Sequence, residues 1–214
     1  MHLWMGGYTV ASIYDIKPQF QNMLRPVVNR LAKTGVTPNQ VTVFATILSM
    51  ITGVLLALYY EYSFILVLIP VIMFVRMAFN AIDGMLAKEH HMKTPLGNIL
   101  NELGDVVSDA CLFLPFALLP GFSPILVIAI VLLSIVSEMT GVLGVAIGAS
   151  RRYDGPMGKS DRAFIFGALA LAIVFGFTHH LTITVILSVI LALIILNICI
   201  RIKRSLEEVN EHGD

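Results

Sequence analysis

The chain has 214 residues and equal numbers of acidic and basic side chains, 14 of each, so its formal net charge is zero. Hydrophobic residues make up 57% of it and charged residues only 13%, whereas soluble domains carry roughly 25% charged residues. This composition argues against a soluble domain, and we expect no nucleic-acid partner. The apolar residues fall in long blocks, which predicts an all-α integral membrane protein.

The first 34 residues differ from the rest of the chain. Residues 1–12 form an apolar N-terminal extension without the basic start and cleavage site of a signal peptide. Residues 13–34 carry apolar side chains at helical spacing with basic residues between them, which predicts an amphipathic helix in the membrane interface. The alternative is a cytoplasmic helix that packs on the bundle. Thr37 or Asn39 is placed to cap the next helix.

Six apolar blocks approach the roughly 20 residues that a membrane-spanning helix needs. They predict one domain of six transmembrane helices, residues 35–200, followed by a cytoplasmic tail, residues 201–214, whose polar end, residues 205–214, is frayed. The predicted spans are residues 40–60, 63–86, 96–119, 123–147, 163–178 and 182–200.

Basic residues are distributed unevenly between the two sides of this predicted bundle. With the N-terminus in the cytoplasm, thirteen of the fourteen Lys and Arg residues fall on the cytoplasmic side, and the outer turns hold none. The positive-inside rule therefore predicts cytoplasmic N- and C-termini. We expect a multi-pass protein of a bacterial inner membrane. The fourteenth basic residue, Arg76, lies inside the second span.

Several ionisable residues lie inside the predicted spans, where charges are costly and usually mark function. Arg76, Asn80 and Asp83 share one helix face of the second span. Asn101 and Asp105 share one face of the third span, and the short loop between the spans makes them antiparallel neighbours. The two polar faces should meet just below the cytoplasmic surface. Carboxylate and amide oxygens there suit a hard divalent cation such as Mg²⁺, which bridges phosphate oxygens in phosphoryl-transfer sites.

Gly84 lies on the same face as Asp83 and would let a phosphate approach the backbone closely. A structural alternative is a polar cluster in which Arg76 neutralises Asp83 or Glu102. A transporter with an ion path is another alternative, but it requires polar residues up to the outer surface, and the outer halves of the spans are nearly free of charge.

Residues 80–105 read NAIDGMLAKEHHMKTPLGNILNELGD. This segment resembles the signature of the CDP-alcohol phosphotransferase family, Asp-x2-Asp-Gly-x2-Ala-Arg-x8-Gly-x3-Asp-x3-Asp, and every spacing fits. Residues 35–42, GVTPNQVT, also resemble the segment that leads into the family's first span. The resemblance implies transfer of a phosphatidyl-type group from a CDP-linked lipid, such as CDP-diacylglycerol, to an alcohol, with release of CMP, in phospholipid biosynthesis. It also implies a homodimer, and Gly144 and Gly148 form a weak GxxxG packing signal.

The resemblance further implies which residues form the site. In the family, four aspartates hold two divalent cations, Mg²⁺ or Mn²⁺, and the last aspartate is the proposed base that deprotonates the acceptor hydroxyl. Asp105 takes that last position. The metal positions correspond to Asn80, Asp83, Asn101 and Asp105, and the positions that contact the donor correspond to Asn39, Gly84, Lys88, Thr94 and Gly97.

Three positions depart from the family pattern, because Asn80 and Asn101 replace aspartates and Lys88 replaces arginine. An amide oxygen still ligates a hard cation, but without charge. We expect weaker binding of the metal pair or one cation instead of two, with partial compensation by Glu102 and Asp109. The alternative function is a catalytically altered or inactive relative that binds CDP-lipid.

The predicted loop between the fourth and fifth spans is the other polar feature. Lys159 and Arg162 are predicted to bind the phosphate of the acceptor or those of the donor. For Arg151 and Arg152, ordinary positive-inside charge is an equally good interpretation. Glu138, in the middle of the fourth span, either partners Arg76 or lines the cavity.

Overall fold

The computed structural model describes residues 13–211, and these are almost entirely helical; the predicted extension of residues 1–12 lies outside this range. Their elements, in chain order, are α1 (Ile13–Lys33), α2 (Pro38–Tyr59), η1 (Ser63–Val67), α3 (Leu68–Glu89), α4 (Pro95–Phe113), η2 (Leu114–Leu118), α5 (Pro124–Ala146), α6 (Lys159–Val174) and α7 (His180–Glu211). The η elements are short 3₁₀ turns. The prediction of an all-α protein is confirmed for this part of the chain.

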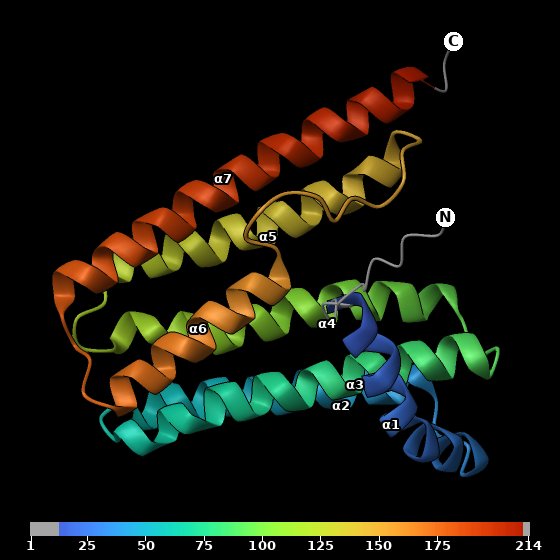
Figure 1. The fold of residues 1–214 in the computed structure, drawn as a ribbon, viewed down its shortest axis with the longest axis horizontal. Coiled ribbons are helices and arrows are strands. Elements are labelled where there is room, and N and C mark those ends of the chain that lie inside the picture. Colours follow the sequence, from blue (N-terminus) through green and yellow to red (C-terminus); the bar gives the residue numbers. More distant parts are fainter. Residues whose placement is uncertain (1–12, 212–214) are drawn as a thin grey trace, which may run out of the picture.

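Four helical segments are long and apolar enough to cross a membrane: Pro38–Tyr59, Ser63–Glu89, Pro124–Ala146 and His180–Glu211. The chain is therefore a membrane protein. The helices α4 and α6 lie alongside these segments in the bundle (Figure 1). However, α4 carries several acidic side chains and α6 has only 16 residues. A total of six spans remains a prediction.

Proline residues and side-chain caps determine where the helices begin. Thr37 accepts a hydrogen bond from the backbone of Gln40, and Gln40 bonds back to Thr37, so a capping box starts α2. This result confirms one of the two predicted caps. Thr94 caps α4 by accepting from the backbone N–H of Gly97. Each cap is followed by a proline, whose fixed φ suits the first helical position.

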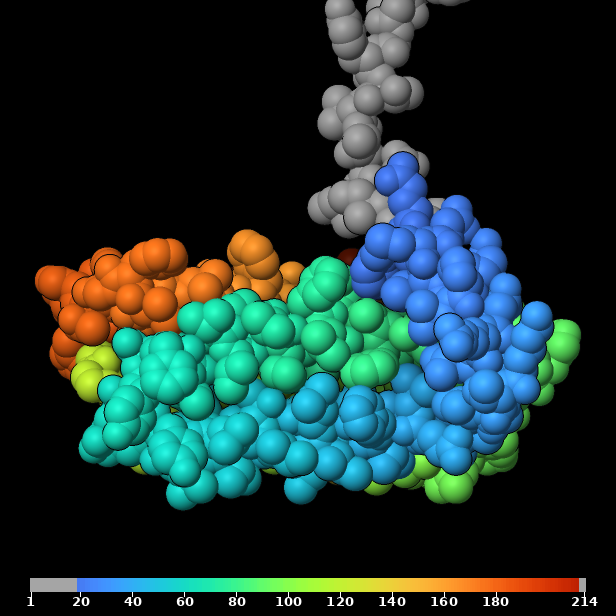
Figure 2. Space-filling model, turned by 90° about the horizontal axis from the view of Figure 1, so that it is seen from below, coloured from blue at the N-terminus to red at the C-terminus, as the bar shows by residue number. Residues whose placement is uncertain are grey.

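The helix α1 crosses one end of the bundle, whereas α2 to α7 run along its length (Figure 1). Figure 2 shows α1 lying over the ends of its neighbours. Its buried Val28 packs with Val41 of α2 and with Leu86 of α3, and Arg25 forms an exposed ion pair with Glu89. The α1 helix thus packs on the bundle, and its placement in the membrane interface remains a prediction.

The largest apolar core lies toward the end opposite α1. Phe113 and Phe166 stack with ring centroids 4.3 Å apart, and Phe116 meets Phe166 edge to face at 5.0 Å. Gly53 allows α2 to approach α4 closely, since a Cβ there would lie 2.1 Å from the carbonyl oxygen of Cys111. The interior is closely packed here, and the cavities that contain the predicted site residues lie nearer to α1.

The helix α7 continues to Glu211, so the prediction of a frayed end is wrong for residues 205–211. The cause is a set of contacts with the segment after α5. Arg201 is almost fully buried and donates to the carbonyl oxygens of Ser137, at 2.6 Å, and Asp154, at 3.2 Å. Arg204 also contacts the Asp154 carboxylate. These bonds hold the polar end of the helix in place.

Candidate functional site

The polar faces of α3 and α4 meet, as the sequence predicts. Asn80 Nδ2 donates to Asp105 Oδ1 at 3.2 Å, which joins the two helices directly. A cavity of about 620 Å³ opens beside this contact, and its wall includes Asn80, Asp83 and Asn101. Three of the four predicted metal positions therefore face one space, and the fourth, Asp105, lines a neighbouring cavity of about 240 Å³.

The residues predicted to contact the donor line the same large cavity. They are Asn39, Gly84, Lys88, Thr94 and Gly97. Asn39 Nδ2 lies 3.5 Å from Thr94 Oγ1, so the starts of α2 and α4 adjoin there. No atom lies within 4 Å of the position that a Cβ of Gly84 would take, so the backbone is open to a ligand at that point.

Asp83 is held by a residue that the sequence reasoning did not single out. Thr42 Oγ1 donates to Asp83 Oδ2 at 2.7 Å, and both side chains are buried. Thr42 is the last residue of the GVTPNQVT segment and lies one helical turn after Pro38. The sequence signal for this contact was the position of Thr42 on the face of α2 that packs against α3.

Asp105 is surrounded by nitrogen donors. In addition to Asn80, Arg76 lies 3.5 Å from Asp105 Oδ1, and Lys159 Nζ contacts Asp105 Oδ2. Arg76 also bonds Asp109 at 2.9 Å. The proposed neutralisation of Asp83 or Glu102 by Arg76 is therefore wrong, because the guanidinium points at the two carboxylates of α4 instead.

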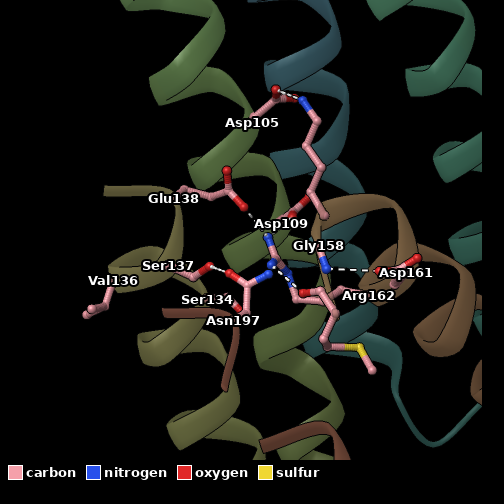
Figure 3. Close-up of polar contacts among 12 residues, drawn as sticks. Asp105, Asp109, Ser134, Val136, Ser137, Glu138, Gly158, Asp161, Arg162 and Asn197 are labelled. Atoms are coloured by element: carbon pink, nitrogen blue, oxygen red, sulfur yellow. Dashed lines mark hydrogen bonds and ion pairs between the residues drawn. The ribbon is translucent and has the colours of Figure 1, made fainter. Parts of the chain in front are cut away.

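Glu138 of α5 lies behind the site and is shared by three arginines. Its carboxylate lies 3.0 Å from Arg151, 3.1 Å from Arg162 and 3.5 Å from Arg201. Figure 3 shows Glu138, Asp109 and Arg162 grouped beside Asp105. The predicted pairing of Glu138 with Arg76 is wrong. Glu138 lines a cavity of about 250 Å³ that also includes Lys159, but it does not line the two cavities beside Asp83 and Asp105.

The two basic residues predicted to bind phosphate occupy different environments. Arg162 is 1% exposed, and besides Glu138 it bonds Asp109 at 3.4 Å and the carbonyl oxygen of Met157 at 3.1 Å. It does not line the two cavities beside Asp83 and Asp105. Lys159 lines all three of the cavities described above. The structure thus brings Lys159, but not Arg162, to the predicted metal positions.

The segment from 147 to 158 turns back along the bundle before α6 begins (Figure 1). Ion pairs hold it in place: Asp154 lies 2.8 Å from Arg152 and also contacts Arg204. Burial raises the pKa of Asp154, but the hydrogen bonds and charges of Arg204 and Arg152 outweigh this effect, so its pKa lies below the usual 3.8. The segment is therefore a fixed part of the site wall.

The donor set fits one divalent cation better than two. Within residues 13–211, no group of three or more His, Cys, Asp or Glu side chains is arranged to hold a metal ion. Asp83 and the amides of Asn80 and Asn101 share the large cavity and supply the oxygen ligands that Mg²⁺ and Mn²⁺ accept. On the other side, both Asp105 oxygens already face nitrogen donors.

The two acidic residues that were expected to compensate for the asparagines are paired elsewhere. Glu102 bonds Arg151 at 2.8 Å, and Asp109 bonds Arg76 and Arg162. A cation bound to either carboxylate would therefore have to displace an arginine. A second cation next to Asp105 does not fit the residues present.

Comparisons with known proteins agree with this geometry. The CDP-alcohol phosphatidyltransferase family model matches residues 35–200. Inner membrane protein YnbA of Escherichia coli strain K12 is 48% identical over 162 residues, which are 76% of this chain and 80% of that protein. An uncharacterized protein of Aquifex aeolicus strain VF5 is 34% identical over 104 residues, 49% of each chain.

Two solved structures of the phosphatidylinositol phosphate synthase PgsA1 of Mycobacterium tuberculosis share the fold. The complex with manganese and citrate gives a TM-score of 0.70 at 21% identity, covering 84% of this chain and 87% of that one. The structure with CDP-DAG bound gives a TM-score of 0.62 at 24% identity, with 86% and 92% covered.

Proposed function

Since the chain belongs to the CDP-alcohol phosphatidyltransferase family, whose members transfer a phosphatidyl group from a CDP-linked lipid to an alcohol, we propose that its large cavity binds a CDP-linked lipid such as CDP-diacylglycerol. The acceptor is an alcohol, CMP is the second product, and the reaction is a step of phospholipid biosynthesis. One observation carries this proposal: the five predicted donor contacts and three predicted metal positions line one cavity.

The chemistry follows from the positions of the side chains. Lys88 supplies positive charge and the open backbone at Gly84 supplies room for the diphosphate of the donor. Asp105, in the adjoining cavity, accepts the proton of the acceptor hydroxyl. The acceptor oxygen forms a bond to the phosphorus that carries the lipid, and the bond from that phosphorus to the bridging oxygen breaks. CMP then leaves with the bridging oxygen.

A divalent cation, Mg²⁺ or Mn²⁺, completes the proposal. Asp83 would hold it, together with amide oxygens of Asn80 and Asn101, and Thr42 orients the Asp83 carboxylate. When bound, such an ion polarises phosphate oxygens and offsets their negative charge. Arg162 has no direct contact with substrate in this scheme, because its guanidinium is committed to Glu138, Asp109 and a backbone carbonyl.

We also propose that the site faces the cytoplasm of a bacterial cell and that the protein is a homodimer. The first proposal rests on the basic residues near α1 and the segment after α5. The GxxxG signal gives no support to the proposal of a homodimer. A Cβ at Gly144 would lie 2.9 Å from Ser205 Oγ of the same chain, so Gly144 serves packing of α5 on α7.

The test is CMP release by the purified protein in lipid nanodiscs, with labelled CDP-diacylglycerol and a panel of alcohols. We expect release that requires Mg²⁺ or Mn²⁺ and that falls about 100- to 10,000-fold in Asp105→Asn, the range typical of losing a general base. Glu207→Gln, on the exposed side of α7, should keep wild-type activity. No metal-dependent release with any acceptor would contradict the proposal.

A second candidate is a relative that binds CDP-lipid without turnover. The contact of Lys159 with Asp105 favours it, because it occupies the carboxylate oxygen Oδ2 that a general base would present to the acceptor hydroxyl. This candidate predicts saturable CDP binding in calorimetry together with no CMP release. Release of CMP by the wild-type protein would exclude it.

A further inference from the structure

Lys159 reaches the centre of the site from a helix that begins inside the bundle. Its side chain extends from the first residue of α6 to Asp105 of α4. The start of α6 is fixed, because Gly158 N–H donates to Asp161 at 3.0 Å and Arg162 bonds the carbonyl oxygen of Met157. The ammonium group is therefore placed by the fold rather than by a flexible surface loop.

The carboxylates around Asp105 are already paired with cations before any metal ion binds. Two nearby carboxylates, Asp105 and Asp109, face two cations, Arg76 and Lys159, and Asp109 also faces Arg162. The asparagines at 80 and 101 add no negative charge. A divalent ion within about 4 Å of an ammonium in a poorly solvated site is strongly repelled. Asp83 forms no ion pair among the described residues, and its carboxylate accepts a hydrogen bond from the Thr42 hydroxyl.

We propose that the Lys159 ammonium takes the place of one of the two divalent cations that the four-aspartate pattern implies. The site then divides into two parts. On the side of Asp83, one divalent ion binds carboxylate and amide oxygens, and on the side of Asp105, a lysine built into α6 supplies the positive charge. The position of Lys159 next to all three cavities puts this charge where the phosphates of a donor would lie.

This division explains why an asparagine at position 80 accompanies the lysine at position 159. Asn80 directs its Nδ2 at Asp105 Oδ1 in the same way as Lys159 directs Nζ at Oδ2. An aspartate at position 80 would instead place a second carboxylate against Asp105, which would require a cation between them. The use of the lysine in catalysis rests on the proposed function, whereas the number of metal ions does not.

The test counts Mn²⁺ ions bound to the full-length protein in nanodiscs, by calorimetry and by electron paramagnetic resonance of free Mn²⁺. We expect one ion per wild-type chain. The triple variant Asn80→Asp, Asn101→Asp, Lys159→Met should bind two. The double variant that keeps Lys159 should bind the second ion about tenfold or more weakly than the triple variant.

Lys203→Met, which removes an exposed lysine of α7, is the matched control and should leave the count at one. Lys159→Arg keeps the positive charge, so this variant should also bind one ion. It provides a second measurement if variants with Lys159→Met do not fold. The proposal would be overturned if the wild-type chain bound two ions or none. It would also be overturned if the double and the triple variant bound the second ion with equal affinity. Because these counts need no turnover, they are independent of the CMP-release assay.

Discussion

Gly84 is the residue at which the cavity comes closest to bare backbone. Gly84→Ala would place a methyl group in space that is open in this structure, since no atom lies within 4 Å. Alanine also favours a helix over glycine by about 1 kcal/mol, so the variant should unfold at the same or a higher temperature. We expect the KM for the CDP-linked donor to rise about tenfold, as loss of one close phosphate contact costs roughly 1.4 kcal/mol.

The control for this prediction is Gly167→Ala on α6. A Cβ there would meet Met73 Sδ at an ordinary distance of 3.4 Å, away from the large cavity. Thermal unfolding and donor titration in nanodiscs would measure both variants. An unchanged donor KM in Gly84→Ala, with normal folding, would mean that the diphosphate does not approach this turn of α3.

The sequence was sufficient to predict that the polar faces of α3 and α4 come together, as the contact of Asn80 with Asp105 shows, because helical spacing places these residues on facing sides of two helices joined by a short turn. The sequence was not sufficient to predict which side chains contact Asp83 and Asp105. The contact of Lys159 with Asp105 depends on the path of residues 147–158, which are irregular, and no periodicity encodes that path. Thr42 was missed because a hydroxyl in an apolar helix carries no charge signal.

At the scale of elements, Glu138 connects α5 to three other parts of the molecule. Its carboxylate bonds Arg151 after α5, Arg162 of α6 and Arg201 of α7. Glu138→Gln would leave these buried guanidinium groups without their shared anion. Breaking a buried ion pair by removing one partner costs about 3–5 kcal/mol, so we expect a large loss of stability in thermal unfolding in detergent.

The matched variant is Glu207→Gln, whose exposed pair with Lys203 on α7 should contribute roughly 0–1 kcal/mol. If both variants unfolded at the same temperature, the arginines around Glu138 would have to be stabilised by their other partners. The same pair of variants also separates folding from chemistry, since neither residue lies in the large cavity.

The contact between the segment after α5 and the end of α7 should depend on pH. The pKa of Asp154 is lower in the folded protein than its usual 3.8, because of Arg204 and Arg152. Because folding lowers the pKa of Asp154, its ion pairs stabilise the protein fully at pH values above the pKa of the unfolded chain. This stabilisation is lost as the pH falls through the pKa of Asp154 in the folded protein. The difference in unfolding temperature between wild type and Asp154→Asn should therefore be constant from pH 7 to about pH 5 and shrink below about pH 4. A constant difference down to pH 3 would contradict this assignment.

The boundaries of the elements were predicted best where a cap or a proline marks them. Thr37 and Thr94 begin α2 and α4 within a few residues of the expected positions. The helices predicted at residues 63–86 and 96–119 were right in position, but each segment includes a 3₁₀ turn at the end away from α1, which hydropathy does not reveal. The end of α7 was missed because its polar residues are held by tertiary ion pairs rather than by an apolar face.

At the scale of the whole molecule, the two ends of the bundle differ in chemistry. The interior toward the end opposite α1 is filled by phenylalanine contacts, and the end near α1 holds the cavities of the candidate site, the caps of α2 and α4, and the polar end of α7 (Figure 1). A lipid donor with a charged head group suits this division, because its acyl chains would stay in the bilayer while its diphosphate would lie near Lys88 and Lys159, as proposed above.

The orientation and the number of spans can be measured together by labelling single cysteines. In a variant with Cys111 and Cys199 replaced by serine, we would introduce Tyr153→Cys or His179→Cys, both at exposed positions. With six spans and a cytoplasmic N-terminus, residue 179 lies outside and residue 153 inside. A membrane-impermeant maleimide should therefore label position 179 in intact spheroplasts of a bacterial host and position 153 only after permeabilisation. With only the four apolar segments as spans, both positions would lie on the outer side, so labelling of position 153 in intact cells would show that α4 and α6 do not cross.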